Sequence, residues 1–274
     1  MKLATLRLGD ATAAVRVEGT TAVETGFADV GALLRDGGPS VAATADGARH
    51  DLTTAEFAPV VTRPGKIICA GLNYRNHILE MGRDLPEHPT LFAKYPEALV
   101  GARDAIQLPP ESTRVDWEGE LAVVVGTRVR RAPVERARAA IAGYAVLNDV
   151  TMRDYQYRTL QWLQGKTWEA STPFGPVLAT PDELPSDAEL VTELDGEEVQ
   201  RTPIDDLVFD AAALVSYVST IVTLQPGDVI ATGTPGGVGH AREPARYLSV
   251  GQTLTTRVDG IGELVNVAVA ETRS

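Results

Sequence analysis

The sequence DWEGELAVVV at residues 116–125 joins alternating acidic residues to an unbroken apolar run. Such a run, bounded by polar residues, is typical of a strand buried in a sheet. Alternate side chains of a strand point to one face, so we expect the carboxylates of Asp116, Glu118 and Glu120 to stand side by side. A solvated strand face would explain the same pattern. The apolar continuation instead indicates a buried end, where Gly119 leaves room for close approach.

Carboxylates held together away from water repel one another unless protons or a cation neutralise them. The candidate ligands are oxygen donors, and the sequence has no Cys-x-x-Cys or His-Glu-x-x-His spacing of a zinc site. The pattern therefore favours Mg²⁺ or Mn²⁺, with Ca²⁺ as a further candidate. Asp149 follows a second apolar strand at 144–147 and could be a third ligand, although an aspartate there is also typical of a turn. Lys166 and Arg153 could attract an anionic substrate.

The composition is that of a globular, acidic protein. The chain has 274 residues, of which 25 are basic and 37 acidic, for a net charge of −12. This charge argues against nucleic acid or an anionic membrane as a partner. The single cysteine, Cys69, lies in an apolar strand and is expected to be a buried structural thiol. Neither a signal peptide nor an apolar span is evident, so we expect a cytoplasmic protein.

The elements predicted along the chain are mostly strands. Alternating runs predict a β-meander at 1–25 and hairpins at 191–200 and 257–269. Helical spacing predicts helices at 29–35, 74–81 and 210–223, the last capped by Asp210 or Asp206, and a mobile loop is expected at 82–89. Arg63-Pro64-Gly65 marks a boundary, which predicts a small N-terminal domain at 1–63 and a catalytic domain at 64–274. The fold class is therefore β-rich α+β, without the βαβ repeats of a nucleotide-binding sheet.

Two further segments could carry chemistry. His77 and Glu80 are three residues apart and share one helix face. A carboxylate that polarises an imidazole makes a general base for water, although a weak surface ion pair has the same spacing. The glycine-rich segment 225–239 lacks the ending of a phosphate-binding loop and predicts a tight loop after a strand. Its amides and Thr234 could hold a substrate carboxylate.

Five motifs in order resemble the fumarylacetoacetate hydrolase family over residues 66–269. They are KIICAGLNY at 66–74 with His77 and Glu80 after it, DWEGEL at 116–121, GYAVLNDVTMRDYQ at 143–156, QWLQGK at 161–166 and PGDVIATGTP at 226–235. The resemblance implies a roll of mixed β-sheets, usually a homodimer. It implies that Mg²⁺ or Mn²⁺ binds to Glu118, Glu120 and Asp149. It also implies that His77 with Glu80, on a lid, activates water, and that a small anionic substrate contacts Lys166, Tyr74, Arg153, Gln156 and Thr234.

The resemblance also bears on the substrate. Fumarylacetoacetate hydrolase itself adds an upstream aspartate to the metal, whereas residues 71–74 offer no carboxylate. This favours the shorter bacterial-type members, which act on 2-oxo and 2,4-dioxo acids. We expect a hydrolase that cleaves the C–C bond of an acylpyruvate such as fumarylpyruvate, with the metal and Lys166 stabilising a pyruvate enolate. An oxaloacetate decarboxylase or an isomerase of the 2-hydroxyhepta-2,4-diene-1,7-dioate type would use the same enolate, and a metal-dependent binder without turnover is a third alternative.

Overall fold

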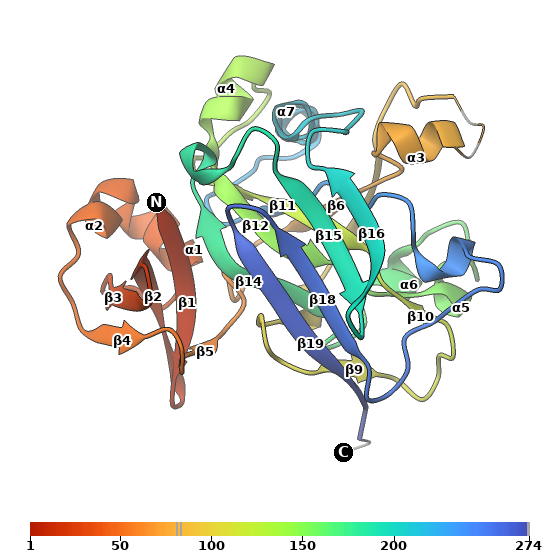
Figure 1. Cartoon of the computed structure of the whole chain (residues 1–274). Helices are drawn as coiled ribbons and strands as arrows, with labels where there is room; N and C mark the ends of the chain where they lie inside the picture. The colour runs from red at the N-terminus through yellow and green to blue at the C-terminus, as the bar shows by residue number, and fades with distance from the viewer. Residues whose placement is uncertain (81, 83, 273–274) are drawn as a thin grey trace.

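A large mixed sheet is the main structural element of the molecule (Figure 1). The computed structural model describes residues 1–80, 82 and 84–272, and the side chains of His77 and Glu80 lie outside this description. The sheet's described strands are β1 (Lys2–Leu8), β2 (Ala11–Glu18), β3 (Thr21–Glu24), β4 (Arg49–Asp51), β5 (Glu56–Phe57), β6 (Ile67–Gly71), β7 (Thr90–Lys94), β8 (Leu99–Val100), β11 (Gly119–Val125), β12 (Ile141–Asn148), β14 (Thr172–Ala179) and β17 (Val229–Ala231). Their order is β4-β3-β2-β1-β14-β12-β11-β17-β6-β7, with β5 beside β1 and β8 beside β14.

A second sheet packs against the first. Its described strands are β9 (Ile106–Leu108), β15 (Glu189–Leu194), β16 (Glu197–Pro203), β18 (Thr253–Val258) and β19 (Gly262–Ala270), in the order β16-β15-β18-β19-β9. Leu121 and Val146 of the first sheet share a buried apolar cluster with Leu190 and Leu264 of the second. A short ladder pairs β10 (Val115–Asp116) with β13 (Thr151–Met152). The predicted β-rich α+β class is confirmed.

The described α-helices are short and lie around the sheets. They are α1 (Val30–Ala32), α2 (Pro39–Thr44), α3 (Arg75–Glu80), α4 (Val134–Ala139), α5 (Arg153–Gln156), α6 (Leu163–Lys166) and α7 (Ala211–Ile221). The predicted helix at 29–35 is divided, because α1 continues into a π-helical turn at Leu33–Gly37. Asp210 caps α7 by accepting a hydrogen bond from the Ala213 amide, as one of the two predicted caps. None of the described helices has the length and apolarity needed to cross a membrane.

Strand β11 is buried on both faces, which explains its continuous apolar run. Ala122 and Val124 belong to a cluster with Cys69, whereas Val123 and Val125 pack on the other side in the cluster that includes α7. Every residue of the strand is buried. Because β11 has no solvated face, polar side chains at its start are also removed from water.

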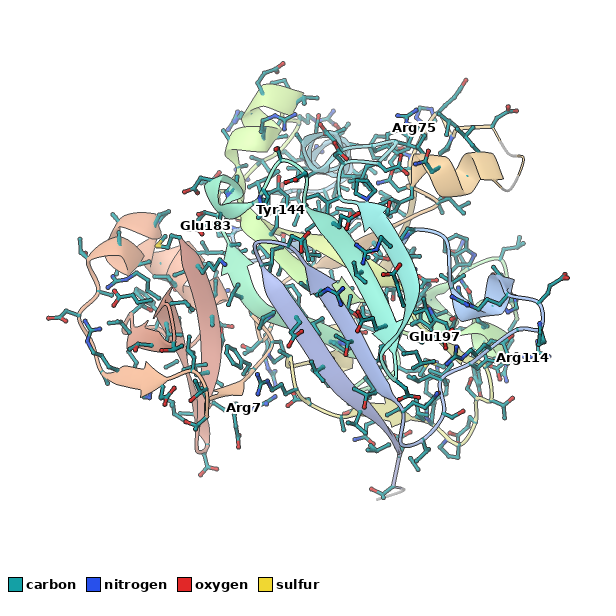
Figure 2. The ribbon with its side chains drawn as sticks, viewed as in Figure 1. Arg7, Arg75, Arg114, Tyr144, Glu183 and Glu197 are labelled. Atoms are coloured by element: carbon teal, nitrogen blue, oxygen red, sulfur yellow. The ribbon has the colours of Figure 1, made fainter. Side chains whose placement is uncertain are left out.

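The N-terminal strands continue the main sheet. The predicted meander is confirmed as β1, β2 and β3, and β1 pairs with β14 through Lys2 and Leu3. Arg7, which Figure 2 labels on β1, forms an ion pair of 2.5 Å with Asp104, and this pair joins the N-terminal strands to the rest of the chain. The predicted hairpins at 191–200 and 257–269 are confirmed as β15–β16 and β18–β19. The domain boundary at residue 63 stays a prediction, as does the mobile loop at 82–89, which includes Arg83 outside the described residues.

Candidate active site

Strand pairing brings three buried carboxylates together. Gly119 in β11 pairs with Asn148 in β12, and the Asp149 amide donates a 2.8 Å hydrogen bond to the carbonyl of Glu118. As a result, Glu118, Glu120 and Asp149 each offer an oxygen atom within 4.8 Å of the others. Gly119 permits this packing, because a Cβ atom there would lie 2.2 Å from Thr192 Oγ1 of the second sheet.

Asp116 does not join this cluster, and the expectation that it stands beside Glu118 and Glu120 is wrong. Asp116 lies in β10, which pairs with β13, whereas β11 begins at Gly119 and pairs with β12 and β17, so no single strand extends from 116 to 120. The Asp116 carboxylate instead accepts hydrogen bonds from Arg153 Nε at 2.8 Å and from the Gly239 amide at 2.7 Å. A solvated face is also excluded, since all three acidic side chains are buried.

Two buried lysines accompany the carboxylates. Lys166 Nζ lies 2.5 Å from Glu118 Oε2 and 2.8 Å from Asp149 Oδ2. Lys94 Nζ lies 2.6 Å from Asp149 Oδ1 and also donates to the main-chain carbonyl of Lys166. Lys94 was not predicted from the sequence as a residue of the site. The local signal that could have found it is a single cationic residue directly after the apolar residues 91–93. The two lysines thus contact different oxygen atoms of Asp149, one from 55 residues before it and the other from 17 residues after it.

The pKa shifts follow from these contacts. Burial disfavours an ammonium ion, but Asp149 and Glu118 outweigh that effect and raise the pKa of Lys166 above its ordinary value. Burial disfavours the Asp149 carboxylate, but Lys166 and Lys94 lower its pKa. Burial, followed by repulsion from Asp149 and Glu118, raises the pKa of Glu120. Lys166 therefore stays protonated at neutral pH and acts as a hydrogen-bond donor, and Glu120 is the carboxylate whose charge is compensated least.

This donor set fits a divalent cation. Within the part of the chain that the structure describes, no lysine or arginine forms an ion pair with Glu120, whose Oε2 accepts only the Gly233 amide at 2.8 Å. A buried carboxylate without a counter-ion is costly, and a cation shared with Glu118 and Asp149 would relieve that cost. Three carboxylate oxygens suit Mg²⁺ or Mn²⁺.

The cluster opens onto a cavity of about 330 Å³. The lining includes the predicted residues Glu118, Glu120, Arg153, Gln156, Lys166 and Thr234. It also includes residues that sequence reasoning did not assign to the site, namely Ala70, Gly71, Leu72, Phe92, Tyr157, Trp162, Val238, His240 and Ala241. Tyr74 is buried and is not part of this lining, so its contact with substrate stays a prediction.

The polar side chains of the cavity are held by one another. Arg153 Nη1 lies 2.7 Å from Glu118 Oε1 and donates to Gln156 Oε1 at 2.9 Å. Burial alone would lower the pKa of Arg153, but Glu118 and Asp116 raise it, so this guanidinium stays charged. In the glycine-rich loop, which follows β17 as expected, the amide at 233 donates to the carboxylate of Glu120. The expected contact of Thr234 and the loop amides with a substrate carboxylate stays a prediction.

The predicted base lies on α3, which follows β6 in the sequence, and the end of β6 at Ala70 and Gly71 lines the cavity. The backbone of His77 and Glu80 is helical, as expected from their spacing. Their side chains lie outside the described residues, so the dyad stays a prediction.

The sequence model of the fumarylacetoacetate (FAA) hydrolase C-terminal family matches residues 66–269. The chain belongs to this family. Members of this family are divalent-metal-dependent enzymes, and the carboxylate triad described above agrees with that dependence. The match begins at β6 and ends in β19, so it contains all the residues of the candidate site.

Named relatives of this FAA hydrolase family member catalyse different reactions. Oxaloacetate tautomerase Fahd2a, mitochondrial, of Rattus norvegicus is 41% identical over 216 residues, which cover 78% of this chain and 69% of the relative. Two solved structures share the fold. The crystal structure of 5-carboxymethyl-2-hydroxymuconate delta-isomerase from Mycobacterium smegmatis is 34% identical, with a TM-score of 0.83 and all of both chains covered. The structure of fumarylacetoacetate hydrolase from Exiguobacterium antarcticum is 31% identical, with a TM-score of 0.90, and the match covers 99% of this chain and all of the other.

Proposed function

We propose that the protein is a divalent-metal-dependent tautomerase or isomerase that moves a proton next to the keto group of a 2-oxo dicarboxylic acid. One observation carries this proposal. Glu118 and Glu120 of the carboxylate cluster line the same cavity as the buried cations Lys166 and Arg153. This combination suits a substrate whose reacting group becomes an oxyanion.

A divalent metal held by Glu118, Glu120 and Asp149 would supply a Lewis acid for the 2-oxo group. Lys166 supports the same charge from the protein. Its ammonium group has three N–H donors, two of which are used by Glu118 and Asp149, so one remains for the substrate oxygen. Because its pKa is raised, Lys166 stays protonated while negative charge develops.

Gln156 and Arg153 would position the carboxylate next to the keto group. Gln156 Oε1 accepts from Arg153, and among the described residues its amide NH₂ has no hydrogen-bond partner, so this group could donate to an anion. The predicted pair of His77 and Glu80 is the candidate for transferring the proton at carbon. A rigid pair of donors and a separate base are the parts that keto–enol interconversion requires.

The names of the relatives support proton transfer over bond hydrolysis. Tautomerases and delta-isomerases both shift a hydrogen without cleaving the carbon chain, and two of the relatives carry these names. Acylpyruvate hydrolysis and oxaloacetate decarboxylation would start from the same site, and both stay predictions. So do the homodimer and the cytoplasmic location.

The test uses oxaloacetate as the probe. We expect the protein with Mg²⁺ or Mn²⁺ to accelerate the relaxation of the enol's ultraviolet absorbance, and EDTA to return it to the uncatalysed rate. Glu118→Gln should abolish the acceleration, whereas Glu197→Gln, at an exposed ion pair, should leave it intact. Pyruvate and CO₂ are measured in the same samples. Pyruvate release from fumarylpyruvate or acetylpyruvate without any effect on the enol would replace this proposal with hydrolysis.

A further inference from the structure

His240 is a cavity residue whose backbone is fixed by the site itself. It lies in a 3₁₀ turn at Gly239–Ala241, after the glycine-rich segment. The His240 amide donates to Asp116 Oδ2 at 3.0 Å, and Asp116 also accepts from Arg153 Nε at 2.8 Å. One buried carboxylate therefore sets the positions of both the imidazole and the guanidinium.

The turn is also sterically locked. A Cβ atom at Gly239 would lie 1.9 Å from the Arg246 carbonyl and 2.8 Å from Asp116 Oδ1. Only glycine allows this approach, so the turn that carries His240 packs directly against Asp116. Such a fixed backbone is the support that a specificity residue needs.

The imidazole ring has one nitrogen engaged and one available. Its Nδ1 lies 2.8 Å from the Tyr247 hydroxyl, and the Tyr157 ring lies 5.4 Å away, tilted by 32°. Within the described residues, Nε2 has no hydrogen-bond partner. His240 lines the cavity. If the phenol O–H donates to Nδ1, then Nε2 carries the ring proton and is the ring nitrogen that remains available as a donor.

The described cations of the cavity are already paired. Lys166 lies against Glu118 and Asp149, and Arg153 lies against Asp116 and Glu118. A substrate with one carboxylate beside its keto group uses the remaining donors near the cluster. A second carboxylate therefore needs a donor elsewhere in the cavity lining, and His240 Nε2 is such a donor.

We propose that His240 is a specificity-determining residue whose Nε2–H donates to the second carboxylate of a 2-oxo dicarboxylic acid. This inference rests on the proposed function, because that function places the keto-acid end of the substrate at the carboxylate cluster. Tyr247 acts as a positioning residue, since its hydroxyl sets the tautomer of the ring. Burial, followed by Arg153, lowers the pKa of His240, so the ring binds as a neutral donor near pH 7.

A matched pair of variants tests the donor. The amide nitrogen of Gln at 240 can take the place of Nε2, whereas the shorter Asn can replace only Nδ1. With oxaloacetate, His240→Asn should lower kcat/KM about 10- to 100-fold, mainly through KM, as expected for the loss of a hydrogen bond to a charged group. His240→Gln should keep most of the activity. With the C4 monomethyl ester, which lacks the second carboxylate, both variants should match the unaltered protein.

The outcomes separate a specific role from a structural one. Tyr247→Phe should reduce the preference for the dicarboxylate and leave turnover of the ester unchanged. An equal loss of activity on both substrates in His240→Asn would show that the residue only supports the fold. An unchanged preference for oxaloacetate over the ester would show that His240 does not bind the second carboxylate. Either result overturns the inference.

Equilibrium binding distinguishes this inference from the proposed function. If the unaltered protein turns over neither substrate, the proposed function has failed. Calorimetry of the Mn²⁺-loaded protein then compares 2-oxoglutarate with 2-oxobutyrate, which lacks the second carboxylate. A preference for 2-oxoglutarate that His240→Asn removes and His240→Gln retains supports the role of His240. No preference, or one that His240→Asn leaves unchanged, overturns it.

Discussion

Replacing Lys94 by methionine should strongly destabilise the protein. The ammonium group of Lys94 is buried, contacts Asp149 Oδ1 at 2.6 Å and donates to the Lys166 carbonyl. Methionine fills nearly the same volume but leaves that oxygen of Asp149 without its cation. The change therefore tests charge compensation more than packing.

The magnitude follows from the contacts that remain. Removing one partner of a buried ion pair costs about 3–5 kcal/mol. Asp149 keeps Lys166 at 2.8 Å, and the variant avoids the cost of burying Lys94 itself. We therefore expect a loss near the lower limit, about 3 kcal/mol, which is a large fraction of the ~5–15 kcal/mol typical of a domain.

Urea unfolding followed by circular dichroism measures this loss, with EDTA present so that metal binding does not contribute. Arg138→Gln is the matched control, because it breaks an ion pair with Asp210 whose side chains are 62% and 55% exposed. That control should cost less than about 1 kcal/mol. A Lys94→Met variant within about 1 kcal/mol of the unaltered protein would refute the reasoning.

A double-mutant cycle measures the interaction between Lys94 and the carboxylate charge of Asp149. Asp149→Asn removes the carboxylate charge that Lys94 compensates, so the combined variant should lose at least about 1 kcal/mol less than the sum of the single losses. Additive losses would show that the two side chains are energetically independent despite their contact.

Four further predictions concern positions around the site. Gly119→Ala should cost about 1–3 kcal/mol in the urea assay, because its Cβ would lie 2.2 Å from Thr192 Oγ1; an unchanged midpoint would contradict the close packing of the two sheets. Asp210→Ala should cost about 1 kcal/mol through the lost cap of α7, whereas Asp210→Ser should recover most of it; equal losses would rule out capping. Cys69 should react with a thiol reagent only in urea, because the thiol is buried and burial raises its pKa; rapid labelling of the native protein would disprove this. The His240 imidazole should show a pKa below 6.5 by NMR, because burial disfavours its cation. As the pH falls, the unfolded chain then binds a proton before the native protein does, so the free energy of unfolding should fall between pH 6.5 and the native pKa. A native pKa at or above 6.5 would contradict this.

The sequence predicted elements whose signals are local. The apolar run of β11 and the hairpin turns depend on neighbouring side chains and on turn residues such as Asp195 and Gly196, which both have positive φ. The ordered motifs also predicted the family, and the structure brings together Glu118, Glu120 and Asp149. Each turn and each motif is a short stretch of consecutive residues, whereas the approach of Glu118 to Asp149 depends on the pairing of β11 with β12.

The central strand β14 was not predicted, because its sequence opposes its conformation. It contains Pro173 and Pro176, which cannot donate to a ladder, and proline within a run normally argues against a central strand. Its neighbours β1 and β12 and an irregular register near Val146 accommodate it. Long-range pairing therefore outweighed local propensity.

The family, the β-rich class and the residue types that could carry the chemistry follow from the amino-acid sequence alone. The balance of the buried charges does not, because it depends on the folded chain: Asp116 binds Arg153, and Lys94 compensates Asp149 from 55 residues away. The tertiary structure also placed His240, from a loop without a local signal, in the lining of the cavity. The physical reason is that periodicity records which side chains avoid water, whereas the partner of a buried charge depends on which distant strands lie together.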